Sequence, residues 1–204
     1  MKTIQSWPKQ LVVLLSLFGA CLAQAGSPAG TLAAWGDNEF GQTIVPSGLT
    51  NAVAIAGGGY HTLALRSNST VVAWGYNGDG ETAVPAGLSN VVAIAGGGWH
   101  SLALQSSGTV VAWGDNKFGQ TTVPSSLNSV VAIAGGFYHS LALQSSGKVV
   151  GWGYNADGET TVPSALTTAA AISAGYAHSL ALQSNRTVVA WGYNGDGEAS
   201  VPPG

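Results

Sequence analysis

Four histidines and nine acidic residues are the side chains of this 204-residue chain best suited to acid–base chemistry or metal binding. The histidines follow glycine-containing turns and recur every 39 residues, at His61, His100, His139 and His178. Several carboxylates recur as pairs two residues apart, such as Asp79 with Glu81. Catalysis by two carboxylates needs one privileged site. Groups that recur in several copies of a unit therefore indicate a structural or surface role.

The same residues do not predict a metal site. Ligands of one ion must lie about 2 Å from it, and histidines on separate units are too far apart unless they ring a narrow channel. The segment Asn77–Glu81 resembles a calcium loop but lacks the leading Asp and the distant bidentate Glu. The chain has no G-x-S-x-G, H-E-x-x-H, phosphate-loop or dinucleotide motif. We expect a non-enzymatic protein with no catalytic residue, metal or cofactor.

A repeated unit must position these residues. Its Trp-Gly pair recurs every 39 residues, at Trp35, Trp74, Trp113, Trp152 and Trp191. This period indicates a repeat architecture. Within one unit, Val91–Ala95, Ser101–Gln105 and Val110–Trp113 predict strands, and Gln120–Val123, ended by Pro124, predicts a short fourth strand. The predicted fold is all-β: a β-propeller of four-stranded antiparallel blades, with about four and a half repeats.

The core is predicted to lie between successive blades, because each blade is covered on both faces. Val92, Ile94, Leu102 and Trp113 are expected to project large groups, with Ala103 leaving a hollow opposite. All five repeat tryptophans are predicted to pack in this core rather than to contact a ligand.

The N-terminal segment has the pattern of a secretory signal peptide. Lys2 and Lys9 precede the apolar run Leu11–Phe18, and Ala23–Ala25 offers small residues for cleavage. The alternatives are a membrane anchor, although the run is shorter than the roughly 20 residues a span needs, and a lipoprotein signal at Cys21 with a poor lipobox. The predicted organisation is a signal peptide at 1–25, a linker at 26–30 and propeller repeats at 31–204. The repeats comprise a partial blade at 31–51, full units at 52–90, 91–129 and 130–168, and a final unit at 169–204.

Charge and cysteine content limit the partners and the compartment. Cleavage after residue 25 leaves four basic and nine acidic residues, a net charge of −5, and no cysteine. Binding to nucleic acid depends on Lys and Arg that neutralise phosphates, so a nucleic-acid partner is not expected. Export would need no disulfide. We expect a secreted, periplasmic or cell-surface protein with no membrane span after cleavage.

Two sets of connections are predicted to share one face of the propeller. The first-to-second connection carries an aromatic residue near each histidine, and the third-to-fourth connections together carry all nine acidic residues. Rigid rings within charge of one sign suit a protein partner. The predicted protein-binding face comprises Tyr60, Trp99, Phe137, Tyr138, Tyr176, Asp37, Tyr76, Asp115, Tyr154 and Tyr193. The alternative is that these rings only cover blade edges.

The unit from Ala134 to Leu143 and on through Trp152 closely resembles the regulator of chromosome condensation repeat. The run Val110 to Pro124 is similar to that of secreted bacterial propellers of the beta-lactamase inhibitor protein II type. The resemblance implies a propeller, usually of seven blades, whose aromatic and acidic loops contact a target enzyme. One specific expectation is inhibition of a secreted or periplasmic hydrolase. The signal peptide and the acidic balance disfavour guanine nucleotide exchange and chromatin binding.

The number of units departs from that family pattern. Four histidine hairpins alternate with five Trp-Gly hairpins, so the first and last half-units are of the same kind. The chain is then part of a longer, incomplete seven-bladed ring, an open arc that closes by self-association, or a four-bladed ring. The corresponding alternative function is a structural or adhesive cell-surface repeat module, or a fragment of a larger repeat protein.

Overall fold

The regular structure in the described part of the chain is entirely β. The structure is a computed structural model that describes residues 32–202. The predicted signal peptide, the linker and Cys21 lie outside the described residues. Within residues 32–202, no helix has the length and apolar character required to cross a membrane.

Within residues 32–202, four antiparallel sheets follow one another, and each contains three strands in sequence order. We call each sheet, with the loop that follows it, a blade. The first contains β1 (Ala52–Gly57), β2 (His61–Arg66) and β3 (Val71–Gly75). The second contains β4 (Val91–Gly96), β5 (His100–Gln105) and β6 (Val110–Gly114). The third contains β7 (Val130–Gly135), β8 (His139–Gln144) and β9 (Val149–Gly153). The fourth contains β10 (Ala169–Ala174), β11 (His178–Gln183) and β12 (Val188–Gly192).

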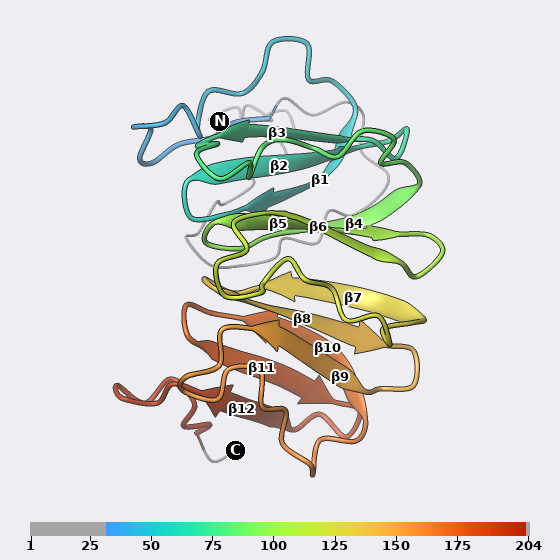
Figure 1. Ribbon diagram of the computed structural model, residues 1–204, viewed down its shortest axis with the longest axis vertical. Coiled ribbons are helices and arrows are strands. Elements are labelled where there is room, and N and C mark those ends of the chain that lie inside the picture. The colour runs from blue at the N-terminus through green and yellow to red at the C-terminus, as the bar shows by residue number, and fades with distance from the viewer. Residues whose placement is uncertain (1–31, 203–204) are drawn as a thin grey trace, which may run out of the picture.

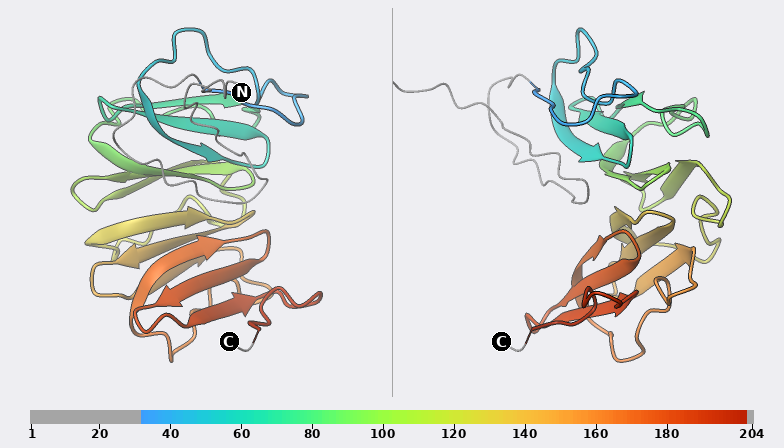
Figure 2. Two further views of the ribbon diagram at one scale, coloured as in Figure 1. Left: turned by 180° about the vertical axis from the view of Figure 1, so that it is seen from behind. Right: turned by 90° about the vertical axis from the view of Figure 1, so that its left-hand side faces the viewer.

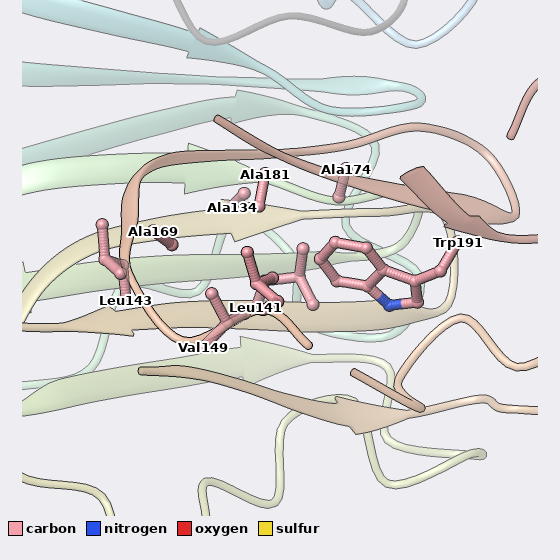
Figure 3. Packing of buried hydrophobic residues seen from close by; sticks show 9 residues of the cluster. Ala134, Leu141, Leu143, Val149, Ala169, Ala174, Ala181 and Trp191 are labelled. Carbon is pink, nitrogen blue, oxygen red and sulfur yellow. The ribbon is translucent and has the colours of Figure 1, made fainter. Parts of the chain in front are cut away.

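The blades are stacked in an open arc (Figures 1 and 2). The all-β fold with propeller-type blades, predicted from the repeat, is confirmed. Each blade packs on the next, and the apolar core lies between them. Figure 3 shows one such layer, in which Leu141 and Val149 of the third blade face Ala181 and Trp191 of the fourth.

The prediction of a fourth strand at Gln120–Val123 was wrong. This segment forms tight turns, with Thr122 N donating to Gly119 O at 3.0 Å and Val123 N to Thr121 O at 3.0 Å. The carbonyl of Gln120 accepts side-chain hydrogen bonds from Ser140 and Trp152 of the next blade. The segment therefore joins two blades and does not extend one sheet, which explains why the sheets have three strands.

The position predicted for Val92 was also wrong. A register shift between Val91 and Ala93 in the β4–β5 pairing leaves Val91 buried and Val92 exposed. Val131 is exposed beside the equivalent irregularity in β7. A bulge changes which face of the strand a side chain meets, and simple alternation does not reveal its position.

The Trp-Gly pair ends the third strand because the backbone approaches closely there. Gly114 has φ of 100°, in the left-handed region that favours glycine, and a Cβ at this position would lie 2.8 Å from Trp99 O. The Trp113 side chain is buried against the preceding blade, and its Nε1 donates to Glu81 O at 2.8 Å. Conformation and packing thus require both members of the pair.

Four of the five repeat tryptophans lie in the core as predicted, and Trp35 does not. Trp74, Trp113, Trp152 and Trp191 are at most 9% exposed, whereas Trp35 is 47% exposed. Each buried indole donates to a carbonyl 32 residues earlier, on the preceding repeat. Trp35 belongs to the first half-unit and has no preceding blade among the described residues, so it lacks this environment.

Candidate binding face

The turns before each histidine and the loops after each third strand lie at the same end of the blades. Backbone hydrogen bonds join them: Tyr76 N donates to Tyr60 O at 2.8 Å, and Asp115 N donates to Trp99 O at 2.8 Å. The same bond recurs from Tyr154 N to Tyr138 O at 2.9 Å. The shared face predicted from topology is confirmed. We call it the loop face; it comprises turns 58–60, 97–99, 136–138 and 175–177 and loops 37–42, 76–81, 115–120, 154–159 and 193–198.

Nine aromatic side chains form one connected network across this face. Tyr60 and Tyr76 contact Trp99 with ring centroids 5.0 and 5.2 Å apart, and Trp99 reaches Phe137 at 6.1 Å. Phe137 stacks on Tyr176 at 4.2 Å. Most of the other contacts are edge-to-face, an arrangement that aromatic rings favour. The network comprises Phe40, Tyr60, Tyr76, Trp99, Phe118, Phe137, Tyr138, Tyr154 and Tyr176.

The network contains a three-ring cluster that occurs twice, two repeats apart. Phe40 lies 5.5 Å from Tyr60 and 4.9 Å from Tyr76. The equivalent Phe118 lies 5.0 Å from Tyr138 and 4.9 Å from Tyr154. Corresponding residues are 78 positions apart, twice the blade period. The face therefore presents two similar aromatic clusters with different neighbours. Trp99 contacts the first cluster, and Phe137, which stacks on Tyr176, contacts the second.

The structure brings most of the predicted face residues together. Seven of the ten lie in the network, while Tyr193 is exposed and makes no ring contact with it among residues 32–202. Phe40 and Phe118 were not among the predicted site residues. The signal that could have found them is that two of the five loops, at 37–42 and 115–120, have the form Asp-Asn-x-Phe-Gly-Gln. The loops at 76–81, 154–159 and 193–198 have the form Tyr-Asn-x-Asp-Gly-Glu.

Asp37 and Asp115, the two predicted acidic contacts, have a role within their own loops. Asp115 Oδ2 accepts a hydrogen bond from Gln120 Nε2 at 2.8 Å, and its Oδ1 accepts one from Lys117 N at 2.9 Å. Asp37 Oδ2 accepts from Gln42 Nε2 at 3.3 Å. These carboxylates satisfy buried glutamines, and Asp115 is itself half-buried.

Two of the nine acidic residues carried by these loops do not lie at the surface of the face. Glu81 and Glu159 occupy the positions of Gln42 and Gln120 and are fully buried. One oxygen of each accepts a backbone hydrogen bond, from Asp79 N or Asp157 N at 3.0 Å, and the other oxygen has no hydrogen-bond partner within the described residues. Burial is the main cause that raises the pKa of Glu81. The charge on the rim comes from exposed carboxylates such as Asp79 and Asp157.

Three of the four repeated histidines, His61, His100 and His139, are buried between blades, and His178 in the last blade is half-buried. His61 Nε2 lies 3.0 Å from Ser101 Oγ, and His139 Nε2 lies 3.0 Å from Ser179 Oγ. Burial lowers the pKa of His61 and of His139 to about 4. His61, His100 and His139 thus each pair with a serine on the next blade. Within residues 32–202, no three His, Asp or Glu side chains are grouped as metal ligands would be.

Stacked antiparallel sheets of a common repeat, with one set of bonds between each blade and the next, define a repeat protein of the β-propeller class. A model of the regulator of chromosome condensation (RCC1) repeat matches residues 52–81, 91–120, 130–159 and 169–198. These segments make up more than half of the chain, and the chain belongs to this family.

Solved structures confirm the fold. Prp20p from Saccharomyces cerevisiae, described with its binding to Gsp1p and histones, is similar at 24% identity and a TM-score of 0.64, over 74% of this chain and 48% of that one. The ectodomain of the Physcomitrella patens receptor kinase CR4 gives 24% identity and a TM-score of 0.67, over 82% and 48%. Human WBSCR16 is similar at 22% identity and a TM-score of 0.62, over 78% of this chain and 56% of that one. The chain thus spans about half the length of these structures. A sequence search of curated proteins gave no match.

Proposed function

We propose that this chain is an exported, non-enzymatic protein-binding module whose partner contacts the aromatic network of the loop face. The observation that carries the proposal is the continuity of nine rings across the blades, with Phe40 and Phe118 exposed within it. Aromatic side chains dominate the binding energy of protein interfaces because they bury large rigid areas. Membership of the RCC1-repeat family supports a binding role, and the similar Prp20p is described with its binding to Gsp1p and histones.

The charge at the rim indicates what kind of partner surface fits. Asp79, Asp157 and Asp196 are exposed in the loops around the rings. Lys117 is the one basic residue of the loop face, and its Nζ lies 5.5 Å from the Phe118 ring centroid. A partner patch with an apolar centre and basic margins complements this arrangement, and its association would slow as salt is added.

Binding by the network is tested with Trp99→Ala and Tyr138→Ala together. The double variant should retain the unfolding transition of the parent chain and lose capture of a secreted or periplasmic protein, with a Kd weakened at least roughly thirty-fold, equivalent to about 2 kcal/mol. Arg66→Ala and Lys148→Ala, at the β2–β3 and β8–β9 turns, are matched controls at the opposite end and should bind normally. Unchanged capture by the double variant would contradict the assignment of this face.

Inhibition of a secreted or periplasmic hydrolase is the specific form of the proposal, and it rests on the similarity of Val110 to Pro124 to the beta-lactamase inhibitor type of propeller. The assay is nitrocefin hydrolysis by a purified β-lactamase titrated with the chain. Inhibition should be lost in the Trp99 and Tyr138 double variant. Absence of inhibition at micromolar chain removes this form of the proposal but leaves the wider binding role open to the capture assay.

Export is tested separately by expressing the 204-residue chain and sequencing the N-terminus of the secreted product. A product that begins at Gly26 is expected. Retention of residues 1–25 would contradict the signal peptide and favour an anchor.

A second candidate is a structural or adhesive segment of a larger repeat protein. The observation that favours it is that the chain spans about half the length of the similar solved structures. A reading frame that continues past Gly204 with further 39-residue units would support this candidate.

A further inference from the structure

Each blade contacts the next through the same set of hydrogen bonds. Glu81 O accepts from Trp113 Nε1 at 2.8 Å and from Ser101 Oγ at 2.8 Å. The next two contacts repeat this pattern on the carbonyls of Gln120 and Glu159. A terminal blade whose carbonyl at this position has no such donor can therefore accept a hydrogen bond from the tryptophan of another blade packed against it.

The β10–β12 sheet is the last blade among the described residues, and its outer face is not covered by a following blade. We call this uncovered face the β10–β12 edge. Leu182 is 41% exposed, although its equivalents Leu65, Leu104 and Leu143 are at most 4% exposed. Val188 is 44% exposed, and its equivalents Val110 and Val149 are at most 7% exposed. The sheet therefore presents apolar side chains of the kind that other blades cover.

A hollow of about 400 Å³ opens at the loop-face end of this edge. Its lining includes His178, Leu180, Tyr193 and Glu198 together with residues 173–177. In the interior blades, the corresponding space holds the tryptophan and serine of the following blade. Glu198 is the residue equivalent to Glu81 and Glu159, and its carbonyl has no tryptophan donor among residues 32–202.

The other end of the arc carries the complementary group. Trp35 is 47% exposed and is the one repeat tryptophan whose indole donates to no carbonyl within the described residues. One end therefore offers an exposed indole donor, and the other offers a carbonyl acceptor beside an apolar hollow.

We propose that the β10–β12 edge of one copy of this chain receives Trp35 of a second copy, with the Trp35 indole donating to the Glu198 carbonyl. The contact continues the series of bonds that already joins the blades within one chain. It uses two different surfaces, so it is heterologous, and copies joined in this way close into a ring or extend into a chain. Trp35 and Leu182 are the residues that this contact would bury.

The test is the mass of the purified chain in solution, measured by sedimentation over a range of concentrations. The parent chain should show reversible association above the monomer mass. Trp35→Ala and Leu182→Asp should each be monomeric, because each removes one of the two surfaces. Both side chains are exposed, so far-ultraviolet circular dichroism and thermal unfolding should confirm that both variants fold. Val92→Asp is the matched control, an exposed apolar residue away from both ends, and should associate like the parent.

Mixing the two variants distinguishes this contact from a symmetric one. Trp35→Ala retains the β10–β12 edge and Leu182→Asp retains Trp35, so the mixture should form dimers and nothing larger. A parent chain that stays monomeric at all concentrations would overturn the proposal. So would a Trp35→Ala variant that still associates, since this would indicate an edge that pairs with itself. The Trp99 and Tyr138 double variant should keep the parent's mass, which separates this contact from binding at the loop face.

Discussion

The Nε2 atom of His100 lies 2.9 Å from the Oγ atom of Ser140 on the next blade, 40 residues along the chain. Ser140 Oγ in turn donates to Gln120 O at 2.9 Å. The serine hydroxyl proton is therefore already used in the bond to Gln120 O. Nε2 of His100 must then carry a proton and donate it to Ser140 Oγ. Nδ1 of His100 is then an unprotonated atom, buried and without a hydrogen-bond partner in the part of the chain that the structure describes. Protonation of this ring would place a charge where nothing accepts its second proton.

The first prediction is a loss of stability in mild acid. Burial, with smaller repulsion from His61 and His139, lowers the pKa of His100 to about 3 from an ordinary value of 6.5. The unfolded chain thus binds more protons than the native chain between these values. The stability from a neutral His100 is complete above pH 6.5 and is lost as the pH falls toward 3. Urea unfolding at a series of pH values from 7.5 to 4.5 should show a falling midpoint.

His100→Asn is the variant that isolates this effect. It should reduce the stability at pH 7.5, because the pairing with Ser140 is weakened, and should flatten the fall in acid. The buried carboxyl of Glu81, whose pKa is raised, has an effect of the opposite sign, so the comparison is made between the slopes of the two proteins. Equal slopes would show that His100 does not control the acid response.

The blades could be predicted from the sequence, because a fixed 39-residue period with strand and turn patterns leaves few alternatives. The surroundings of individual residues could not. The exposure of Val92 depends on a bulge, and the burial of Glu81 depends on the loop folding back beneath the next blade. Trp35 has the sequence of a core residue and lacks only the neighbouring blade. In each case the deciding interaction is made with another strand, loop or blade, which the local pattern does not contain.

The second prediction concerns the Asp115 and Gln120 pair. Asp115→Ala leaves the fully buried Gln120 Nε2 without its acceptor and removes the bond to Lys117 N. An unsatisfied buried donor costs about 1–3 kcal/mol, so the free energy of unfolding should fall by this amount. The control is Asp157→Ala, an exposed carboxylate in another loop of the same face, which should change stability by less than about 0.5 kcal/mol. Equal effects of the two changes would contradict the role given to Asp115.

The third prediction concerns the buried carboxyl of Glu81. Its pKa is raised by burial, so the native chain binds more protons than the unfolded chain above the ordinary value of 4.5. This carboxyl favours the fold at low pH, and that contribution is lost as the pH rises through the raised value. Glu81→Gln removes the charge and should raise the free energy of unfolding at pH 8 by roughly 1 kcal/mol, with a smaller gain at pH 5.

Glu198→Gln is the matched control for that substitution. Glu198 accepts the same backbone hydrogen bond, from Asp196 N at 3.0 Å, but is only half-buried. Its replacement should therefore change stability less at both pH values. A gain from Glu81→Gln that is identical at pH 5 and pH 8 would show that the buried charge is not the cause.

The fourth prediction is that Gly97→Ala destabilises the protein through the histidine it covers. Gly97 has no positive φ, so the backbone tolerates alanine, but a Cβ at this position would overlap Cε1 and Nδ1 of His100 and lie 2.8 Å from Gly136 O. The imidazole must then move away from Ser140 in a packed interface between blades. Overpacking of this kind costs about 1–3 kcal/mol, measurable as a lower free energy of unfolding in urea.

The chain offers a control for Gly97→Ala in Gly195→Ala. A Cβ on Gly195 would meet only the ring and hydroxyl of the exposed Tyr193 side chain, and Ala156 already occupies the equivalent position one repeat earlier. This change should cost less than about 0.5 kcal/mol. In a His100→Ala background, Gly97→Ala should cost less than in the parent chain, because the clashing ring is gone, while the contact with Gly136 O remains. An undiminished cost in that background would show that glycine is required at position 97 by the neighbouring backbone and not by the histidine.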